Sequence, residues 1–443
     1  MANMKNLNIE HENINFELNG HKHKIVTDTV RWNHKTGSLM YYLSEPELSE
    51  KERTVIFQVK ELAKNKRKNI RNIGEVAELY DSLKGKLSID TTSTEDAVVV
   101  YYIYRDVFGY GKIEGLIWDP NIKFISFDRI GAPITVFHKD YGYIPTNVII
   151  STPYELSDLL LLLRDRSISR NEDKNILIGR TVLGSVIFLN KTTDTFAIRK
   201  TEPVFCHPLT LLMKTGLANV EMLSFIEFFL KNKSSILVIG PKISNKIDFI
   251  SGLCSVLDDS KIVTFEIVPE FNLLSDKWIP EILPLHMYSD SNVIGNVLRH
   301  APDYVVVNGV TGPALKGIVN RMSKDYSGIV SIDAKSIDEG IKVLQTSIDK
   351  SALTDFDIIV LLTAEKRNRR YLQRIKEIAE VVEYSPDEDK MILNTVFKWD
   401  IKSDTIVPLR SVLLEKLVKK TGKNPKKLIE ELKHFIRSKS SLA

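Results

Sequence analysis

Short, nearly continuous hydrophobic runs recur through the second half of the chain. Runs of this kind are typical of parallel strands that are buried on both faces, and the segments between them have helical spacing. We expect such strands at residues 235–239, 261–265, 304–307, 328–332 and 356–362. Beyond Pro208, this alternation predicts an α/β fold in which a mainly parallel sheet carries helices on both faces.

The stretch from Thr91 to about residue 202 has a different pattern. One apolar helix is expected from Thr94 to Phe108 and another from Pro153 to Arg166. Turn signals separate short strand-like segments at residues 123–127, 134–137, 147–150, 185–189 and 195–200. The pattern predicts a smaller α+β domain that precedes the α/β domain.

Residues 1–90 are polar and rich in lysine, and helical spacing within residues 47–84 predicts an N-terminal helical arm. Pro203 and Pro208 indicate a linker between the two domains. The predicted organisation is an arm at residues 1–90, an α+β domain at 91–202, a linker at 203–208, an α/β domain at 209–405 and a basic helical tail at 406–443.

Composition adds limits to this picture. The 443 residues suffice for roughly two to four domains, and the net charge of +4 does not demand a nucleic-acid partner. The two cysteines, Cys206 and Cys254, cannot form a disulfide framework or a four-thiolate zinc site, which favours a reducing compartment. No apolar run approaches the ~20 residues that cross a bilayer, and the first residues lack the layout of a signal peptide. We expect a cytosolic protein, or one docked on a membrane from the cytosolic side.

The tail from Glu415 onward carries nine Lys or Arg residues against three acids. One interpretation is a set of solvated helices with a single packing stripe, formed by Leu413, Leu414, Leu417 and Val418. A second is attraction to an anionic membrane surface. A third is nucleic-acid binding, although Phe435 is the one aromatic residue in the tail that offers a stacking surface.

One strand-to-helix junction carries candidate chemistry. The expected strand at residues 235–239 runs into Gly240-Pro-Lys-Ile-Ser-Asn-Lys-Ile247, and an apolar helix follows. This is the layout of a phosphate-binding loop, in which amide groups and a helix N-terminus face the anion. Asn245 stands in place of the second glycine, Ile247 replaces the hydroxyl that holds Mg²⁺, and Pro241 removes one amide donor. The layout alone leaves two interpretations open, a nucleotide site and a plain turn.

Eight short sequence strings, which occur in the same order as in one protein family, make a resemblance to that family specific. They are Phe108-Gly-Tyr-Gly-Lys-Ile-Glu114, Asp119-Pro-Asn-Ile122, Tyr141-Gly-Tyr-Ile-Pro-Thr-Asn147, Phe196-Ala-Ile-Arg-Lys200, Trp278-Ile-Pro280, Pro302-Asp-Tyr304, Glu377-Ile-Ala-Glu380 and Leu393-Asn-Thr-Val-Phe-Lys-Trp-Asp400. With them, residues 92–405 resemble the assembly ATPases of type II and type IV secretion systems, type IV pili and the archaellum, most closely the archaeal branch. Members of this family have an N-terminal α/β domain and a RecA-like P-loop domain, and they form hexamers with ATP between subunits.

The resemblance assigns seven positions to nucleotide binding: Gly240, Ser244, Asn245, Lys246 and Ile247 in the loop, and Arg180 and Arg199 in the preceding domain. Asn245 and Ile247 depart from the family pattern, and Val186 replaces a further arginine. Plain structural interpretations stay open beside these roles. Lys246 would then be a solvated lysine at a helix start, and the two arginines would form ion pairs between domains or subunits.

The catalytic positions depart further from the family. Glu266 and Glu270 remain as candidate catalytic residues, although both also suit a simple strand end. Asn308-Gly-Val-Thr311 stands where the family has a glycine, the catalytic glutamate, an apolar residue and an arginine. Tyr326 and Asp333 fill the places of two histidines. Phosphoryl transfer depends on cations that hold developing charge and on a group that orients water, so these losses predict a pseudo-ATPase.

The resemblance implies a structural or regulatory subunit of an assembly system at the inner face of the cell membrane. We expect at most weak binding of ATP and Mg²⁺. We expect no side chains that act as metal ligands, and no zinc. Expected partners are a family ATPase paralogue or further copies of the same chain in a ring, and a polytopic membrane platform protein, but not nucleic acid. The alternatives are a slow motor that uses Glu270 to orient water and a nucleic-acid-binding adaptor.

Overall fold

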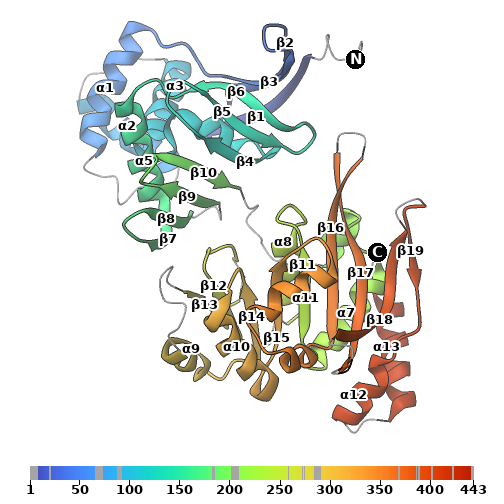
Figure 1. Ribbon diagram of the computed structural model, residues 1–443. Coiled ribbons are helices and arrows are strands. Elements are labelled where there is room, and N and C mark those ends of the chain that lie inside the picture. Colours follow the sequence, from blue (N-terminus) through green and yellow to red (C-terminus); the bar gives the residue numbers. More distant parts are fainter. Residues whose placement is uncertain are drawn as a thin grey trace. The chain divides into compact units, whose positions relative to one another are not determined.

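The computed structural model describes residues 8–18, 21–64, 73–86, 92–181, 185–200, 209–257, 259–271, 273, 275–283, 291–367, 370–385, 387, 390–400, 403–421 and 424–440. The chain separates into two compact units, residues 1–201 and 202–443 (Figure 1). One hydrophobic core lies entirely within the first unit, and two others lie entirely within the second. The predicted linker at residues 203–208 lies outside the described residues.

The first unit combines one large sheet with several helices. Its elements are β1 (Asn8–Leu18), β2 (His21–Asn33), β3 (Ser38–Ser44), α1 (Glu50–Lys64), α2 (Ile73–Lys86), α3 (Ser93–Ile103), η2 (Tyr104–Phe108), η3 (Gly111–Ile113), α4 (Glu114–Trp118), β4 (Ile122–Phe127), β5 (Pro133–His138), β6 (Gly142–Ile149), α5 (Pro153–Arg166), β7 (Ser167–Glu172), β8 (Ile176–Thr181), β9 (Val186–Asn190) and β10 (Thr195–Arg199). The sheet order is β1-β2-β3-β6-β5-β4-β10-β9-β8-β7. Within it, β3 and β6 form a parallel pair and the other neighbours are antiparallel. The predicted α+β character of this unit is confirmed.

The prediction of a helical arm at residues 1–90 is wrong for its first half, because residues 8–44 form β1, β2 and β3. In β1 and β2, residues such as Asn, His, Lys and Glu interrupt the apolar positions, which weakens the β signal in the sequence. Pairing within the sheet nevertheless supplies partners for their backbone groups. Tyr41 and Leu43, two positions apart on β3, are both buried, as the strand period requires. The first helix of the described residues is α1.

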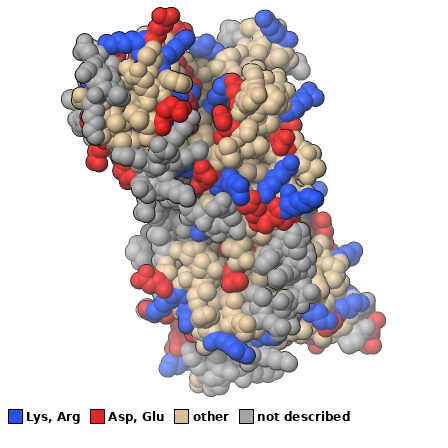
Figure 2. Space-filling view, turned by 90° about the vertical axis from the view of Figure 1, so that its left-hand side faces the viewer, with Lys and Arg blue, Asp and Glu red and all other residues tan. Residues whose placement is uncertain are grey.

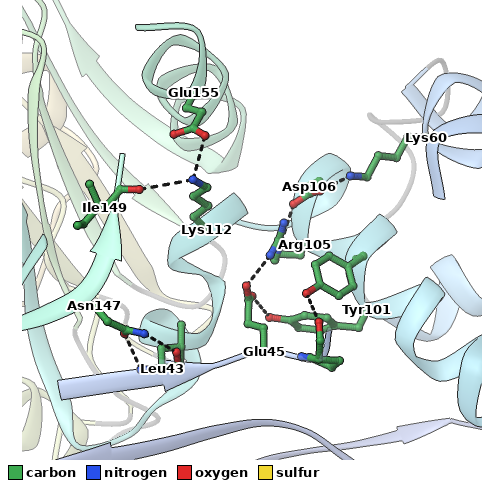
Figure 3. A network of polar contacts seen from close by, with 12 residues as sticks. Leu43, Glu45, Lys60, Tyr101, Arg105, Asp106, Lys112, Asn147, Ile149 and Glu155 are labelled. Atoms are coloured by element: carbon green, nitrogen blue, oxygen red, sulfur yellow. Dashed lines mark hydrogen bonds and ion pairs between the residues drawn. The ribbon is translucent and has the colours of Figure 1, made fainter. Parts of the chain in front are cut away.

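A polar network fixes α1 and α3 to the segment after β3 (Figure 3). The guanidinium of Arg105 bridges Glu45 and Asp106, with a distance of 2.6 Å in each pair. Lys60 of α1 also pairs with Asp106, and the Tyr101 hydroxyl donates to Glu45 at 2.6 Å. Because the Arg105 side chain is only 12% exposed, water screens these charges weakly. The network therefore joins α1 firmly to the helix that leads into Phe108.

The second unit is built around a nine-stranded sheet. Its elements are α6 (Leu209–Lys214), α7 (Val220–Lys231), β11 (Ile236–Gly240), α8 (Lys246–Ser255), β12 (Ile262–Glu266), β13 (Trp278–Ile282), α9 (Ser291–Leu298), β14 (Tyr304–Asn308), α10 (Gly312–Asp325), β15 (Ser327–Asp333), α11 (Ile337–Gln345), η4 (Lys350–Asp355), β16 (Ile358–Arg367), β17 (Arg370–Ser385), β18 (Lys390–Asp400), β19 (Thr405–Pro408), α12 (Leu413–Thr421) and α13 (Pro425–Ser440). The sheet order is β13-β12-β14-β15-β11-β16-β17-β18-β19. Pairing is parallel from β13 to β16 and antiparallel from β16 to β19. The five strands expected from the hydrophobic runs are β11, β12, β14, β15 and β16, and the predicted RecA-like fold is confirmed.

Both faces of this sheet are covered by helices, as the continuous hydrophobic runs predict. On β11, Ile236 and Val238 pack into a core with residues of α7 and α8. Leu237 and Ile239 point the other way, into a core with residues of α9, α10 and α11. A strand buried on both faces has no polar side, which explains why its sequence shows no alternation.

The basic tail folds onto the same unit. Leu413 and Leu417 are buried in the core that contains α7, and Leu414 and Val418 pack against it, as the predicted stripe requires. The ring of Phe435 on α13 lies 6.3 Å from that of Phe228 on α7. Within the described residues, no helix is both long enough and apolar enough to span a membrane.

Candidate functional site

The phosphate loop, which we define as residues 240–247, joins β11 to α8. A Cβ added at Gly240 would lie 2.5 Å from Ser244 Oγ and 3.0 Å from Leu362 Cβ, which is too close for a side chain. Ser244 is fully buried, and its hydroxyl donates to the Pro241 carbonyl at 2.7 Å. Gly240 and Ser244 therefore have a packing role in the loop, whatever ligand the loop takes.

The ammonium group of Lys246 is bound by the protein itself. Its side chain is 7% exposed, and Nζ donates to the carbonyl oxygens of Gly240 at 2.6 Å and Pro241 at 3.2 Å. Nζ also donates to Asp333 Oδ1 at 2.5 Å. Asp333 ends β15, which pairs with β11, and it fills one of the places where the family has a histidine. The interpretation of Lys246 as a solvated lysine is wrong, because the side chain is enclosed and ion-paired.

Asn245 adopts the left-handed backbone conformation that a glycine would otherwise supply. Its φ is 59° and its ψ is 35°, a region that Asn tolerates better than most residues. The Asn245 amide donates to Gln373 Oε1 at 2.6 Å, and Gln373 Nε2 donates back to the Ile243 carbonyl at 2.7 Å. Gln373 lies on β17, so one side chain from the antiparallel part of the sheet holds the phosphate loop at two points.

Ile247, which the resemblance aligns with the family's Mg²⁺ ligand, offers no oxygen atom in its side chain. Its side chain is partly buried and packs against the core that contains α7 and α8. A hydrocarbon side chain cannot coordinate a hard cation, which prefers oxygen ligands. Among the described residues, no group of three or more His, Cys, Asp or Glu side chains is arranged to hold a metal ion. The residues at this loop do not fit Mg²⁺.

The carboxylate of Glu266 is engaged by the backbone that follows it. Glu266 ends β12 and is 1% exposed, and its Oε2 accepts hydrogen bonds from the amides of Glu270 at 2.7 Å and Phe271 at 2.9 Å. These bonds tie the turn to the end of β12, and the Glu270 amide also donates to the Val268 carbonyl at 2.8 Å. The arrangement suits a structural carboxylate that shapes the turn.

Glu270 belongs to a buried hydrogen-bonded chain. Its Oε2 accepts from Asn308 Nδ2 at 2.7 Å, and Asn308 Oδ1 accepts from the Ser331 hydroxyl at 2.5 Å. All three residues are at most 8% exposed. The resemblance aligns Asn308 with a glycine of the family, and in this chain its side chain engages Glu270.

Gly309 is the residue that the resemblance aligns with the family's catalytic glutamate. Its φ is 68°, in the left-handed region, and a Cβ added there would meet no atom within 4 Å. Space is therefore available, but a glutamate would have to adopt a backbone conformation that costs an L-residue about 1–2 kcal/mol. The local backbone is adapted to glycine.

In the first unit, Arg180 on β8 and Arg199 on β10 both pair with Val186 of β9. Directly paired residues share one face of a sheet, so the three side chains form a row across neighbouring strands. Val186 is fully buried and the two arginines are half-buried. The missing third arginine thus corresponds to an apolar core position between the two that remain, and a role toward nucleotide stays a prediction.

Sequence reasoning missed Gln373. It lies more than 120 residues from the phosphate loop, on a strand that the hydrophobic pattern did not predict, and no spacing motif points to it. Asp333 and Asn308 were noticed only as replacements, and their bonds to Lys246 and Glu270 depend on the pairing of β11, β14 and β15. The one sequence signal that pointed to any of these contacts was the polar residue at position 308, where the resemblance expects a glycine.

Comparison with known proteins finds proteins that are similar to this chain in sequence. "Uncharacterized protein MJ1287" from Methanocaldococcus jannaschii is 28% identical over 234 residues, which are 50% of this chain and 87% of that protein. "Uncharacterized protein MJ0900" from the same organism is 24% identical over 366 residues, which are 78% of this chain and 66% of that protein. No family model matches the chain.

Among solved structures, the chain is similar to several ATPases. The VirB11 ATPase of the Brucella suis type IV secretion system matches with a TM-score of 0.32 and 16% identity, over 60% of this chain and 92% of that chain. The Legionella pneumophila ATPase DotB matches with a TM-score of 0.41 and 13% identity, over 72% of this chain and 85% of that chain. The pilus retraction motor PilT matches with a TM-score of 0.36 and 12% identity, over 68% of this chain and 82% of that chain. The strand order described above is what defines the second unit as a RecA-like α/β domain, preceded by an α+β unit.

Proposed function

We propose that this protein is a non-hydrolysing subunit of a secretion, pilus or archaellum assembly system, related to the archaeal branch of the assembly ATPases. It would act as a structural or regulatory component in the cytoplasm, at the inner face of the cell membrane. Its partners would be a family ATPase paralogue or further copies of itself in a ring, together with a polytopic membrane platform protein. The eight family-like strings and the RecA-like sheet support the assembly role.

One observation carries the non-hydrolysing part of this proposal: the groups left for phosphoryl transfer are engaged within the protein. The Lys246 ammonium is bound by Asp333, the Glu266 carboxylate by backbone amides, and the Glu270 carboxylate by Asn308. Position 309 has no side chain to orient water. A positioned acid or base contributes about 10²–10⁴ in rate, so the combined losses leave little turnover.

ATP and Mg²⁺ fit this site poorly for two separate reasons. The phosphate-facing lysine already has an anionic partner, and no side-chain oxygen stands at position 247 to hold the cation. We therefore assign no catalytic step to either group. The rival interpretation, a slow motor, would need Glu270 to leave its bond with Asn308 and to orient a water molecule.

On the face of the molecule drawn in Figure 2, Lys and Arg side chains are interspersed with Asp and Glu. A protein that binds nucleic acid commonly gathers its positive charge in a patch or stripe, which neutralises phosphates. The interspersed pattern on this face supports the expectation that nucleic acid is not the ligand.

Steady-state ATP turnover of the full chain tests the proposal. We expect no turnover above that of the Lys246→Ala variant prepared in the same way, because the wild-type site lacks a competent acid and cation. Turnover that the wild type shows and Lys246→Ala abolishes would establish a slow motor and defeat the proposal. The Lys246→Ala comparison is needed because contaminating ATPases contribute equally to both preparations.

A further inference from the structure

The Lys246 ammonium group has a protein acceptor for each of its N–H donors. An ammonium group has three N–H donors, and Lys246 Nζ has three acceptors: the carbonyl oxygens of Gly240 and Pro241 and the carboxylate of Asp333. The lysine side chain is 7% exposed, whereas that of Asp333 is 54% exposed. The ion pair therefore has a buried cation and an anion that solvent reaches.

An incoming phosphate would meet this anion first. To reach Nζ, a phosphate oxygen must replace the Asp333 oxygen that lies 2.5 Å away. The displaced carboxylate would then remain nearby as a like charge, which disfavours the bound anion. Asp333 thus acts against phosphate both by occupying the donor and by repulsion.

A second set of hydrogen bonds, made by the Gln373 side chain, holds the backbone around Lys246. The side-chain amide of Gln373 accepts from Asn245 at 2.6 Å and donates to the Ile243 carbonyl at 2.7 Å. Asn245 immediately precedes α8, and Ile243 lies two residues earlier, so the two bonds span the part of the loop that would wrap around a phosphate. Rearrangement of the loop around an anion requires these bonds to break.

We propose that Asp333 and Gln373 together close the phosphate loop, with the Asp333 carboxylate as a built-in anion in place of a phosphate group. The loop then accepts a polyphosphate once these two side chains are removed. This inference rests on the proposed non-hydrolysing function and deepens it, since it assigns the exclusion of nucleotide to two named residues. Hydrolysis would stay absent in the opened loop, because position 309 still lacks a carboxylate.

Calorimetric titration with inorganic tripolyphosphate at low salt tests the inference. We expect the full-length Asp333→Asn/Gln373→Ala variant to bind tripolyphosphate at least tenfold more tightly than the wild type, which is about 1.4 kcal/mol. Each single variant should show part of the gain. Addition of Lys246→Ala to the double variant should abolish it, because the ammonium is the donor that the anion reaches.

Asp349→Asn is the matched control for the change in charge. Asp349 is 62% exposed and pairs with Lys316 at 3.1 Å, so it resembles Asp333 in exposure and in having a lysine partner, but it does not contact the phosphate loop. We expect wild-type binding from this variant. A thermal unfolding curve for each protein verifies that it is folded before the titration.

Two outcomes would overturn the inference: a folded double variant that binds tripolyphosphate no more tightly than the wild type does, or an equal gain in Asp349→Asn. Failure of the proposed function is a separate result, since it requires ATP turnover by the wild type that depends on Lys246. A loop that opens without turnover supports both proposals.

Discussion

At the scale of single residues, most charged groups that the sequence singled out have protein partners. Lys246, Glu266 and Glu270 are each largely enclosed, and each makes bonds that define the local fold. A buried charged group is costly unless it is paired or hydrogen-bonded, so these partners stabilise the fold as it stands. A substitution at any of these three residues would therefore disturb local structure as well as charge.

Glu114 provides a pH-dependent test at this scale. It is 1% exposed and accepts hydrogen bonds from the Tyr110 amide and the Trp118 indole, and burial raises its pKa to about 7. The folded state therefore keeps a proton that the unfolded chain releases near pH ~4.3. Its contribution to stability is fully present below that pH and is lost as the pH rises through about 7.

We expect the free energy of unfolding of the wild type to fall between pH 5 and pH 8, with a contribution from this group of at most about 1.4 kcal/mol per pH unit. In Glu114→Gln that contribution should disappear, although overall stability drops because one donor loses its acceptor. Urea unfolding at several pH values measures both effects. The exposed Glu78→Gln serves as control, and equal pH slopes in wild type and Glu114→Gln would contradict the prediction.

At the scale of elements, the junction of β11, the phosphate loop and α8 depends on close packing. Gly240→Ala would place a Cβ 2.5 Å from Ser244 Oγ and 3.2 Å from the Leu362 carbonyl oxygen. We expect the free energy of unfolding to fall by about 1–3 kcal/mol, because the loop or β16 must move. Denaturant unfolding of the full chain measures the loss.

Gly85→Ala is the control for the same chemical change. Gly85 lies on α2, and a Cβ added there would meet nothing within 4 Å. Alanine favours a helix by up to about 1 kcal/mol over glycine, so this variant should be neutral or slightly more stable than the wild type. Equal losses from both substitutions would show that close packing at Gly240 is not the cause.

Elements also differ in how well the sequence predicted them. The helix expected at residues 153–166 begins and ends at those residues, because Thr152 caps it and Pro153 suits its first turn. The five buried strands were equally clear, since a long apolar run has few other stable placements in a soluble domain. β1 and β2 were missed because Asn, His, Lys and Glu interrupt their strand-favouring residues, and tertiary pairing decides their structure.

The candidate site was predicted in outline only. Spacing placed Gly240 and Lys246 at a strand-to-helix junction, because that signal is local. The partners of Lys246 and Asn245 come from β15 and β17, about 90 and 130 residues further along the chain. Contacts over such distances depend on sheet order, which periodicity in a single sequence does not specify.

At the scale of the whole molecule, the two units have separate hydrophobic cores. A unit with its own core is expected to fold alone. Residues 1–201 and residues 202–443, produced separately, should each unfold cooperatively on heating, as circular dichroism would record.

A fragment of residues 1–150 is the control for this prediction. It lacks β7 to β10, and β10 is the neighbour of β4 in the sheet, so it should show no cooperative transition. If residues 1–201 behave like this shorter fragment, the first unit does not fold independently and the prediction fails.

The burial of α7 has a consequence for synthesis of the chain. Nine consecutive residues of this helix, Met222 to Leu230, are buried, and α13 supplies part of the cover. α13 leaves the ribosome roughly 200 residues after α7, a delay of about 10–40 s at about 5–20 residues per second. During that interval the apolar residues of α7 lack the cover that α13 later provides. This stretch is therefore a clear target for chaperones that bind nascent chains.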